Sequence, residues 1–358
     1  MGALPAPPEG IDMFITLRIS TVVLIFLGIN SASSHAMQDE TPVEKPSIQL
    51  EELPKERIRL RSWIIEGRAI AALPDLNSYL ALFPENGALH LLKGEALYAL
   101  ERFEDSASSF SRGVELDPGK LGELFNYGRC LQSLDRYEEA LEVFLSMQSR
   151  SDTSLQVRGY FGEGLSRQSL GNIEEAKRLY QKALTLNPSF DRARYRLALI
   201  LLDDSPDEAL SMLNRVLISD PLHHGGAYNK ALALRNLQRM DDAQKALARY
   251  QQILAGRSRI ALLKERWAMT PNETSILLEL GRVYRSLGVT GESLRWFARA
   301  GGLAPNDPEP AIETLRTLIL AQRRAEALQL VQRLKSTPLY AAAKDQIEDL
   351  LKPPTEEE

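Results

Sequence analysis

The sequence predicts an all-α fold in which antiparallel helix pairs follow one another along the chain. The first observation is the composition, which is rich in Ala, Leu, Glu and Arg, with 25% charged and 7% aromatic residues, and so favours helices. The second is that strand-like runs of Val, Ile and Thr are nearly missing after the first thirty residues, which leaves little to build a sheet. The third is a small residue that recurs with a period close to 34 residues, and such a period indicates repeated structural units.

Residues 1–36 differ from the rest of the chain and are predicted to be a secretory signal peptide. Arg18 precedes an apolar run over residues 19–29, which is too short for a comfortable membrane span, and small residues stand before Met37. We expect cleavage before Met37, with Met13 as an alternative start and an uncleaved anchor as the alternative outcome. The prediction is an exported protein, periplasmic or secreted, with a membrane-anchored form as the alternative. It would meet a membrane only through this segment, if the segment is not cleaved.

Two polar segments that contain proline are predicted to lack a fixed fold, a flexible linker over residues 37–53 and a disordered tail over residues 352–358. Cys130 is the only cysteine, so an internal disulfide is impossible and stability must come from packing. Its neighbours place Cys130 on a helix, where we expect a small buried residue rather than a reactive thiol.

The repeated unit pairs a small residue in a first helix with another small position early in a second helix. Two antiparallel helices pack tightly only where small side chains let their backbones approach. We therefore expect a Leu at Gly164 or Ala176 to cost about 1 to 3 kcal/mol. The two positions are twelve residues apart in six units and eleven apart in one, and the pairs are Gly94 and Ser106, Gly128 and Ala140, Gly164 and Ala176, Ala198 and Ala209, Ala231 and Ala243, Gly281 and Ser293, and Leu315 and Ala327.

Proline marks the ends of several predicted helices. Asp-Pro or Asn-Pro steps occur at residues 117–118, 187–188 and 220–221. Because the residue before proline avoids the α region, the chain must leave its helix at these steps. Residues 338–351 begin with Pro and have amphipathic spacing, which predicts a C-terminal capping helix.

Aromatic residues complete the pattern. The units over residues 160–188 and 277–305 are the most regular, and the first has Tyr180 four residues after Ala176. The small positions, this aromatic and the closing proline resemble the tetratricopeptide repeat family over about residues 53–335. The resemblance implies a right-handed α-solenoid of about eight repeat units with a C-terminal capping helix.

One interval breaks the spacing, because Ala243 and Gly281 are 38 residues apart where four other intervals have 22. Apolar residues keep helical phase here, which favours one long helix from about Asp241 to Ala268 that projects by about 24 Å. The alternative is a break at Gly256, because glycine weakens a helix interior. The predicted domains are an N-terminal repeat array over residues 54–255, an extended helix or bend over 256–271, and a C-terminal array with its capping helix over 272–351.

No catalytic residue, cofactor or metal site is predicted, so the chain is not expected to be an enzyme. Residues 118–121 lack the hydroxyl and the first Gly of a phosphate-binding loop. His223 and His224 are adjacent, so they cannot aim at one metal ion from a helix as an i, i+4 pair can. The net charge of −5, with acids and bases interspersed, argues against nucleic acid as a partner.

The resemblance implies that the first helices line a concave groove for a protein or peptide partner. An apolar and aromatic series recurs there at the repeat period with basic side chains beside it, which suits a segment with acidic groups. The alternative is that the series is ordinary packing of the framework. The candidate groove residues are Leu91, Phe125, Arg129, Phe161, Tyr195, Tyr228, Arg235, Leu278, Arg282 and Arg285, with Ile312, Gln132, Gln168, Asn236 and Arg316 as further members.

The predicted function is a non-catalytic scaffold that binds a peptide or protein segment in this groove, within an envelope or secreted complex. The alternative is a regulatory or substrate-recruiting subunit of a separately encoded envelope enzyme. The family's carboxylate clamp for chaperone tails needs Lys and Asn where this chain has Phe125 and Arg129, or Phe161 and Leu165. That activity is therefore not expected.

Overall fold

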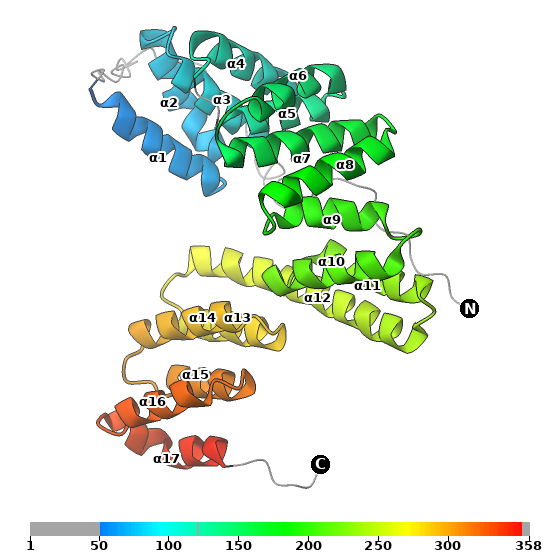
Figure 1. Ribbon diagram of the computed structural model, residues 1–358. Helices are drawn as coiled ribbons and strands as arrows, with labels where there is room; N and C mark the ends of the chain where they lie inside the picture. The colour runs from blue at the N-terminus through cyan, green and yellow to red at the C-terminus, as the bar shows by residue number, and fades with distance from the viewer. Residues whose placement is uncertain (1–50, 120–121, 353–358) are drawn as a thin grey trace, which may run out of the picture. The chain divides into compact units, whose positions relative to one another are not determined.

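The computed structural model describes residues 51–119 and 122–352, and the regular structure in these ranges is entirely helical (Figure 1). The predicted signal peptide and most of the predicted linker and tail lie outside the described residues. The all-α prediction is confirmed. The helices are α1 (Leu53–Ile65), α2 (Ala69–Leu82), α3 (Gly87–Ala99), α4 (Phe103–Leu116), α5 (Leu124–Ser133), α6 (Tyr137–Gln148), α7 (Thr153–Ser169), α8 (Ile173–Leu186), α9 (Asp191–Ile200), α10 (Pro206–Ser219), α11 (His224–Asn236), α12 (Met240–Met269), α13 (Thr274–Ser286), α14 (Thr290–Leu303), α15 (Glu309–Leu320), α16 (Arg324–Leu334) and α17 (Pro338–Leu351).

The chain divides into two compact units after Ala176, inside α8. Each unit is a succession of helices in which neighbours in sequence pack on each other. This division differs from the predicted arrays over residues 54–255 and 272–351, and those domain boundaries stay a prediction.

In the first unit, α1 packs on α2, α3 on α4 and α5 on α6, while α1, α3, α5 and α7 also pack on one another in order. The first helices therefore form a continuous row. Polar caps define several of their starts, because Asn86 and Asp152 accept hydrogen bonds from the backbone N–H of Leu89 and Leu155 at 3.2 and 2.9 Å.

The turn inside six of the hairpins places one residue in the left-handed region, seven positions after the small site of the first helix. The hairpin of α9 and α10 differs, because Ser205 has a negative φ. Glycine takes the left-handed conformation without strain, whereas other residues pay a small steric cost for a compact turn. The residues with positive φ at these turns are Glu101, Asp135, Gly171, Gln238, Gly288 and Gln322.

The small sites of the first helices lie against an aromatic ring of the second. A Cβ atom at Gly94 would lie 2.8 Å from the ring of Phe110, and one at Gly128 would lie 2.4 Å from Phe144. In the second unit, a Cβ atom at Gly281 would lie 2.3 Å from Phe297. The predicted close approach of the two backbones is therefore confirmed at these three sites.

The second unit continues the pattern through α9 to α16 and ends on α17. Ala343 and Ile347 of α17 close a buried cluster that contains Ile312, Leu315 and Val331. The predicted C-terminal capping helix is confirmed, and its apolar side covers the last hairpin.

Residues 240–269 form a single helix, α12, with no break at Gly256. A Cβ atom at Gly256 would lie 2.5 Å from Leu287, at the end of α13. The glycine therefore lets α13 approach α12 closely. The second half of α12 packs on α13 through Ile260 and Leu263.

Candidate partner-binding surfaces

The predicted apolar and aromatic groove series is largely buried. Phe125 stacks on Phe161 with ring centroids 6.2 Å apart, and it also packs against Phe144 at 6.0 Å. The framework interpretation therefore accounts for these side chains better than a role as exposed anchors. Tyr195 is partly buried, and the other members, Leu91, Phe125, Phe161, Tyr228, Leu278 and Ile312, are between 1% and 8% exposed.

Three of the predicted basic groove residues are engaged by one buried carboxylate. Nε of Arg282 donates to Oε1 of Glu313 at 3.0 Å, Nη1 of Arg316 donates to the same oxygen at 3.1 Å, and Arg285 donates to Oε2. Burial raises the pKa of Glu313, but the hydrogen bonds from Arg285 and Arg282 outweigh it and leave the pKa lowered. This cluster joins α13 to α15, and its arginines already have a partner within the chain.

Two other predicted arginines remain available. Arg129 on α5 is half-buried and Arg235 on α11 is exposed. Neither side chain forms a hydrogen bond or ion pair with any residue in the part of the chain that the structure describes. Of the predicted groove residues, these two arginines, one in each unit, are the best candidates to bind a partner.

Polar side chains one repeat apart link successive first helices. Arg61 of α1 donates to Glu95 of α3 at 3.2 Å, and Gln132 of α5 donates to Ser166 of α7 at 2.8 Å. Burial raises the pKa of Glu95, and the charge of Arg61 lowers it only in part. The two residues of each pair are 34 residues apart. The repeat period could therefore have predicted these polar contacts.

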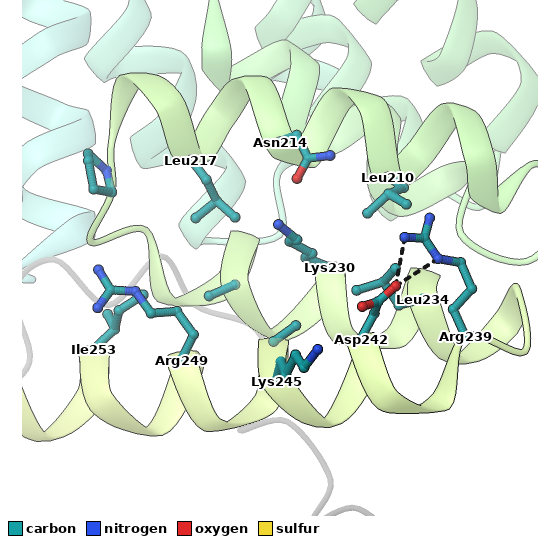
Figure 2. A pocket seen from close by; sticks show the side chains of 13 residues that line it. Leu210, Asn214, Leu217, Lys230, Leu234, Arg239, Asp242, Lys245, Arg249 and Ile253 are labelled. Carbon is teal, nitrogen blue, oxygen red and sulfur yellow. Dashed lines mark hydrogen bonds and ion pairs between the residues drawn. The ribbon is translucent and has the colours of Figure 1, made fainter. Parts of the chain in front are cut away.

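A cavity of about 520 Å³ opens between α10, α11 and α12 (Figure 2). Its apolar wall includes Leu210, Leu217, Leu234 and Ile253. Figure 2 shows Lys230 of α11 between α10 on one side and α12 on the other. This cavity was not predicted, because its lining comes from three helices at unrelated repeat positions.

The rim of the cavity is basic. Arg239 donates to Asp242 at 3.0 and 2.7 Å, and hydrogen bonding to Arg239, with the nearby charges of Lys245 and Lys230, lowers the pKa of Asp242. Lys230 and Lys245 form no hydrogen bond or ion pair with a described residue. Arg249 bonds the backbone carbonyl of Leu287. An apolar wall beside two free ammonium groups suits an apolar side chain flanked by carboxylates.

Residues with potential chemistry have structural roles. Cys130 is buried and its thiol donates to the carbonyl of Phe103 at 3.1 Å, while burial raises the pKa of Cys130. Nδ1 of His223 accepts a hydrogen bond from the backbone N–H of Gly226 at 2.8 Å and caps α11. Over residues 51–119 and 122–352, no cluster of three or more His, Cys, Asp or Glu side chains is arranged for a metal ion. Among the same residues, no helix combines the length and apolarity that a membrane span requires.

These hairpins, with their row of first helices, define the chain as an α-helical repeat protein. Residues 157–190 match one tetratricopeptide repeat model, and residues 67–120 and 204–258 match another. These three segments, about two fifths of the chain, are therefore similar to tetratricopeptide repeats. Repeats of this family generally serve as protein–protein interaction scaffolds and are usually non-catalytic.

Curated relatives share only part of their length with this chain. The Hsp70-Hsp90 organizing protein of Triticum aestivum is 31% identical over 107 residues, 30% of this chain and 18% of that protein. The CTR9 homolog of Arabidopsis thaliana is 31% identical over 126 residues, 35% of this chain and 11% of that protein. The human protein O-mannosyl-transferase TMTC3 is 25% identical over 182 residues, 47% of this chain and 20% of that protein.

Solved structures share the fold at low sequence identity. PilF of Pseudomonas aeruginosa is 17% identical with a TM-score of 0.50, over 55% of this chain and 89% of that one. PilW, a type IV pilus biogenesis factor, is 17% identical with a TM-score of 0.50, over 57% of this chain and 94% of that one.

Proposed function

We propose that this protein is a non-catalytic scaffold that binds a segment of another protein carrying apolar and acidic side chains. The observation that carries the proposal is the cavity between α10, α11 and α12. Leu217 is the partly exposed member of its otherwise buried apolar wall, and Lys230 and Lys245 lie beside this wall without a partner among the described residues. An ammonium group that has no internal partner can bind an incoming carboxylate without first breaking an ion pair.

The predicted groove contributes to the proposal through its two remaining arginines. Arg129 in the first unit and Arg235 in the second can each bind a carboxylate of a protein segment. The buried aromatic series supports the helices that carry these side chains rather than contacting the partner directly.

We also propose that the protein acts after export, in the cell envelope or outside the cell. The support is the sequence of residues 1–36, with its apolar run and the small residues before Met37. Fractionation of the native source with mass measurement of the protein tests this part. A mature chain that begins at Met37 supports export, and a cytoplasmic chain that keeps these residues contradicts it.

The binding proposal is tested by selecting displayed random peptides on the full chain. The expected result is enrichment of peptides with an apolar residue flanked by Asp or Glu. Their binding should fall about tenfold or more when Lys230→Glu and Lys245→Glu are combined. Lys335→Glu, at an exposed site on another helix end, is the matched charge control. Equal binding by the double variant and the control would contradict the proposal.

A further inference from the structure

The second helix α12 is less buried at its equivalent positions than the other second helices compared below. In α4, α6, α10, α14 and α16, the small site and the residues four and seven positions later are all buried, and the side chains there are no more than 7% exposed. The same positions in α12 are Ala243, Leu247 and Tyr250, and all three are only partly buried. Leu254, four residues further on, is 39% exposed.

The cause is the displacement of the next hairpin along α12. Elsewhere the first helix of the following unit lies over these positions, but here the interval to Gly281 is sixteen residues longer. The close contact of Gly256 with Leu287, together with the packing of Ile260 and Leu263, places α13 over the second half of α12 only. Ala243 and Leu247 in the first half of α12 still pack against the buried cluster of α9, α10 and α11. No following first helix in the described part of the chain packs on the rest of their surface, so this half keeps a partly exposed apolar stripe.

The α12 stripe comprises Ala243, Leu247, Tyr250 and Leu254. Their spacing of four, three and four residues puts them on one side of the helix. The stripe is about 17 Å long, the length of three helical turns. In the other units, the chain itself packs its next helix, of ten to seventeen residues, on the second helix.

We propose that the α12 stripe binds an acidic amphipathic helix of about three turns from another protein. We expect a helical ligand because, in the other hairpins, the surface equivalent to the stripe packs against the next helix of the chain. The inference rests on the proposed function only in that the ligand is a protein segment. It uses a different side of α12, because the cavity is lined by Lys245, Arg249 and Ile253 rather than by the stripe.

The acidic character of the ligand follows from the charge of α12. Between Ala243 and Lys264 the helix has five basic residues and no acidic residue, in a chain whose net charge is −5. Of the five, Arg259 already pairs with Glu279 of α13. Tyr228 of α11 lies beside Tyr250, with ring centroids 5.3 Å apart. Because α11 and α12 are antiparallel, Arg235 in the last turn of α11 lies toward the same end of the hairpin as Ala243 and adds a cation there. Lys245 and Arg249 lie within the length of the stripe and Arg257 is three residues beyond it, so these charges act on a helix seated there within about one Debye length, roughly 10 Å.

The same charge disfavours a second copy of this chain as the occupant. A two-fold pairing through the stripe would bring one α12 against the other, and each has the same five bases. An acidic helix from a different protein meets an opposite charge instead.

The test measures fluorescence anisotropy of a labelled synthetic helix added to the full chain. The probe has sixteen residues, with Leu at i, i+4, i+7 and i+11 and Glu on the flanks, and a second probe has Lys on the flanks. We expect saturable binding of the Glu-flanked probe and binding at least about tenfold weaker for the Lys-flanked one. Leu247→Asp should weaken the Glu-flanked probe about tenfold or more, whereas Leu262→Asp, at an exposed site outside the stripe on the same helix, should not. Circular dichroism checks that both variants remain folded.

Several outcomes would overturn the inference. They are no binding by the full chain, equal binding of the two probes, or equal loss in Leu247→Asp and Leu262→Asp. A photo-crosslinking residue at Gln251 that joins two copies, or joins α12 to terminal residues of its own chain, would assign another occupant. The single variant Lys230→Glu separates the two sites, because Lys230 lines the cavity from α11 and is not one of the five α12 bases. A cavity variant that loses the displayed peptides but still binds the Glu-flanked probe supports both proposals. A Leu247→Asp protein that binds the Glu-flanked probe as tightly as wild type shows that the stripe proposal is wrong.

Discussion

Glu313 on α15 accepts a 3.0 Å hydrogen bond from Nε of Arg282 on α13, and this contact ties together the first helices of two successive hairpins. The carboxylate is buried and the guanidinium is partly exposed. Arg285 and Arg316 converge on the same group. Arg282, which the sequence analysis predicted to bind a partner, therefore stabilises the contact between α13 and α15 instead.

Glu313→Gln should lower the free energy of unfolding by about 1 to 3 kcal/mol, because three arginines lose their counter-charge. The loss is limited because water screens the charges of the partly exposed Arg282 and Arg316. The effect should depend on pH. Since the pKa of Glu313 is lowered on folding, its contribution is fully present above the unfolded value of about 4.3. It is lost as the pH falls through the lower folded-state pKa.

Urea denaturation of both proteins between pH 7 and pH 3 measures this prediction. The difference between wild type and Glu313→Gln should shrink on acidification. A difference that stays constant or grows toward pH 3 would show that the Glu313 charge does not stabilise the fold.

Gly162→Ala should destabilise the protein by about 1 to 3 kcal/mol through overpacking. Its Cβ atom would lie 2.3 Å from the ring of Phe144, which already meets Gly128 on its other side. Thermal melting followed by circular dichroism measures the loss. Gly302→Ala is the control, because nothing lies within 4 Å of a Cβ atom there and alanine favours the helix. Melting of the two variants at the same temperature would refute the close packing.

Phe125→Ala should cost about 3 to 5 kcal/mol of stability, because its ring is buried between Phe161 and Phe144. Arg129→Glu, on the same helix, should change stability by less than about 0.5 kcal/mol and should weaken binding of an acidic segment. Chemical denaturation and peptide titration distinguish the two effects. A Phe125→Ala protein of normal stability that has lost binding would restore the exposed-anchor interpretation of the aromatic series.

Cys130 should react slowly with a thiol reagent at pH 7 in the native protein and rapidly after denaturation. Burial raises the pKa of this thiol, so the thiolate fraction at neutral pH is below that of a free cysteine. A chromogenic disulfide reagent, with and without guanidinium, measures the two rates. Equal rates would mean that the α5 region opens readily.

The hairpins, the small sites and the capping helix followed from the sequence, because close helix packing restricts those positions to a few residue types. The length of α12 also agrees with the preferred interpretation, since its apolar residues keep helical phase through Gly256. The residues exposed in the groove could not be predicted as directly from the sequence. Periodicity indicates which side a residue faces, but not whether the neighbouring hairpin covers it, and so buried Phe125 and exposed Arg235 appeared as members of one surface.

The Glu313 cluster and the α12 stripe were missed for related reasons. Glu313 belongs to a degenerate unit with Leu315 at the small site, and its partners lie 28 and 31 residues earlier rather than at the repeat period. The stripe is visible only as a difference in burial between equivalent positions. That difference depends on where α13 packs, which the added sixteen residues do not specify by themselves.

Hydrogen exchange of the full chain with and without the Glu-flanked helix tests most directly whether partner segments bind along α11 and α12. The account predicts added protection of backbone amides over residues 224–254, with α1–α6 and α15–α17 unchanged. Unchanged exchange over residues 224–254 at a saturating peptide concentration, or protection spread evenly over the chain, would contradict it.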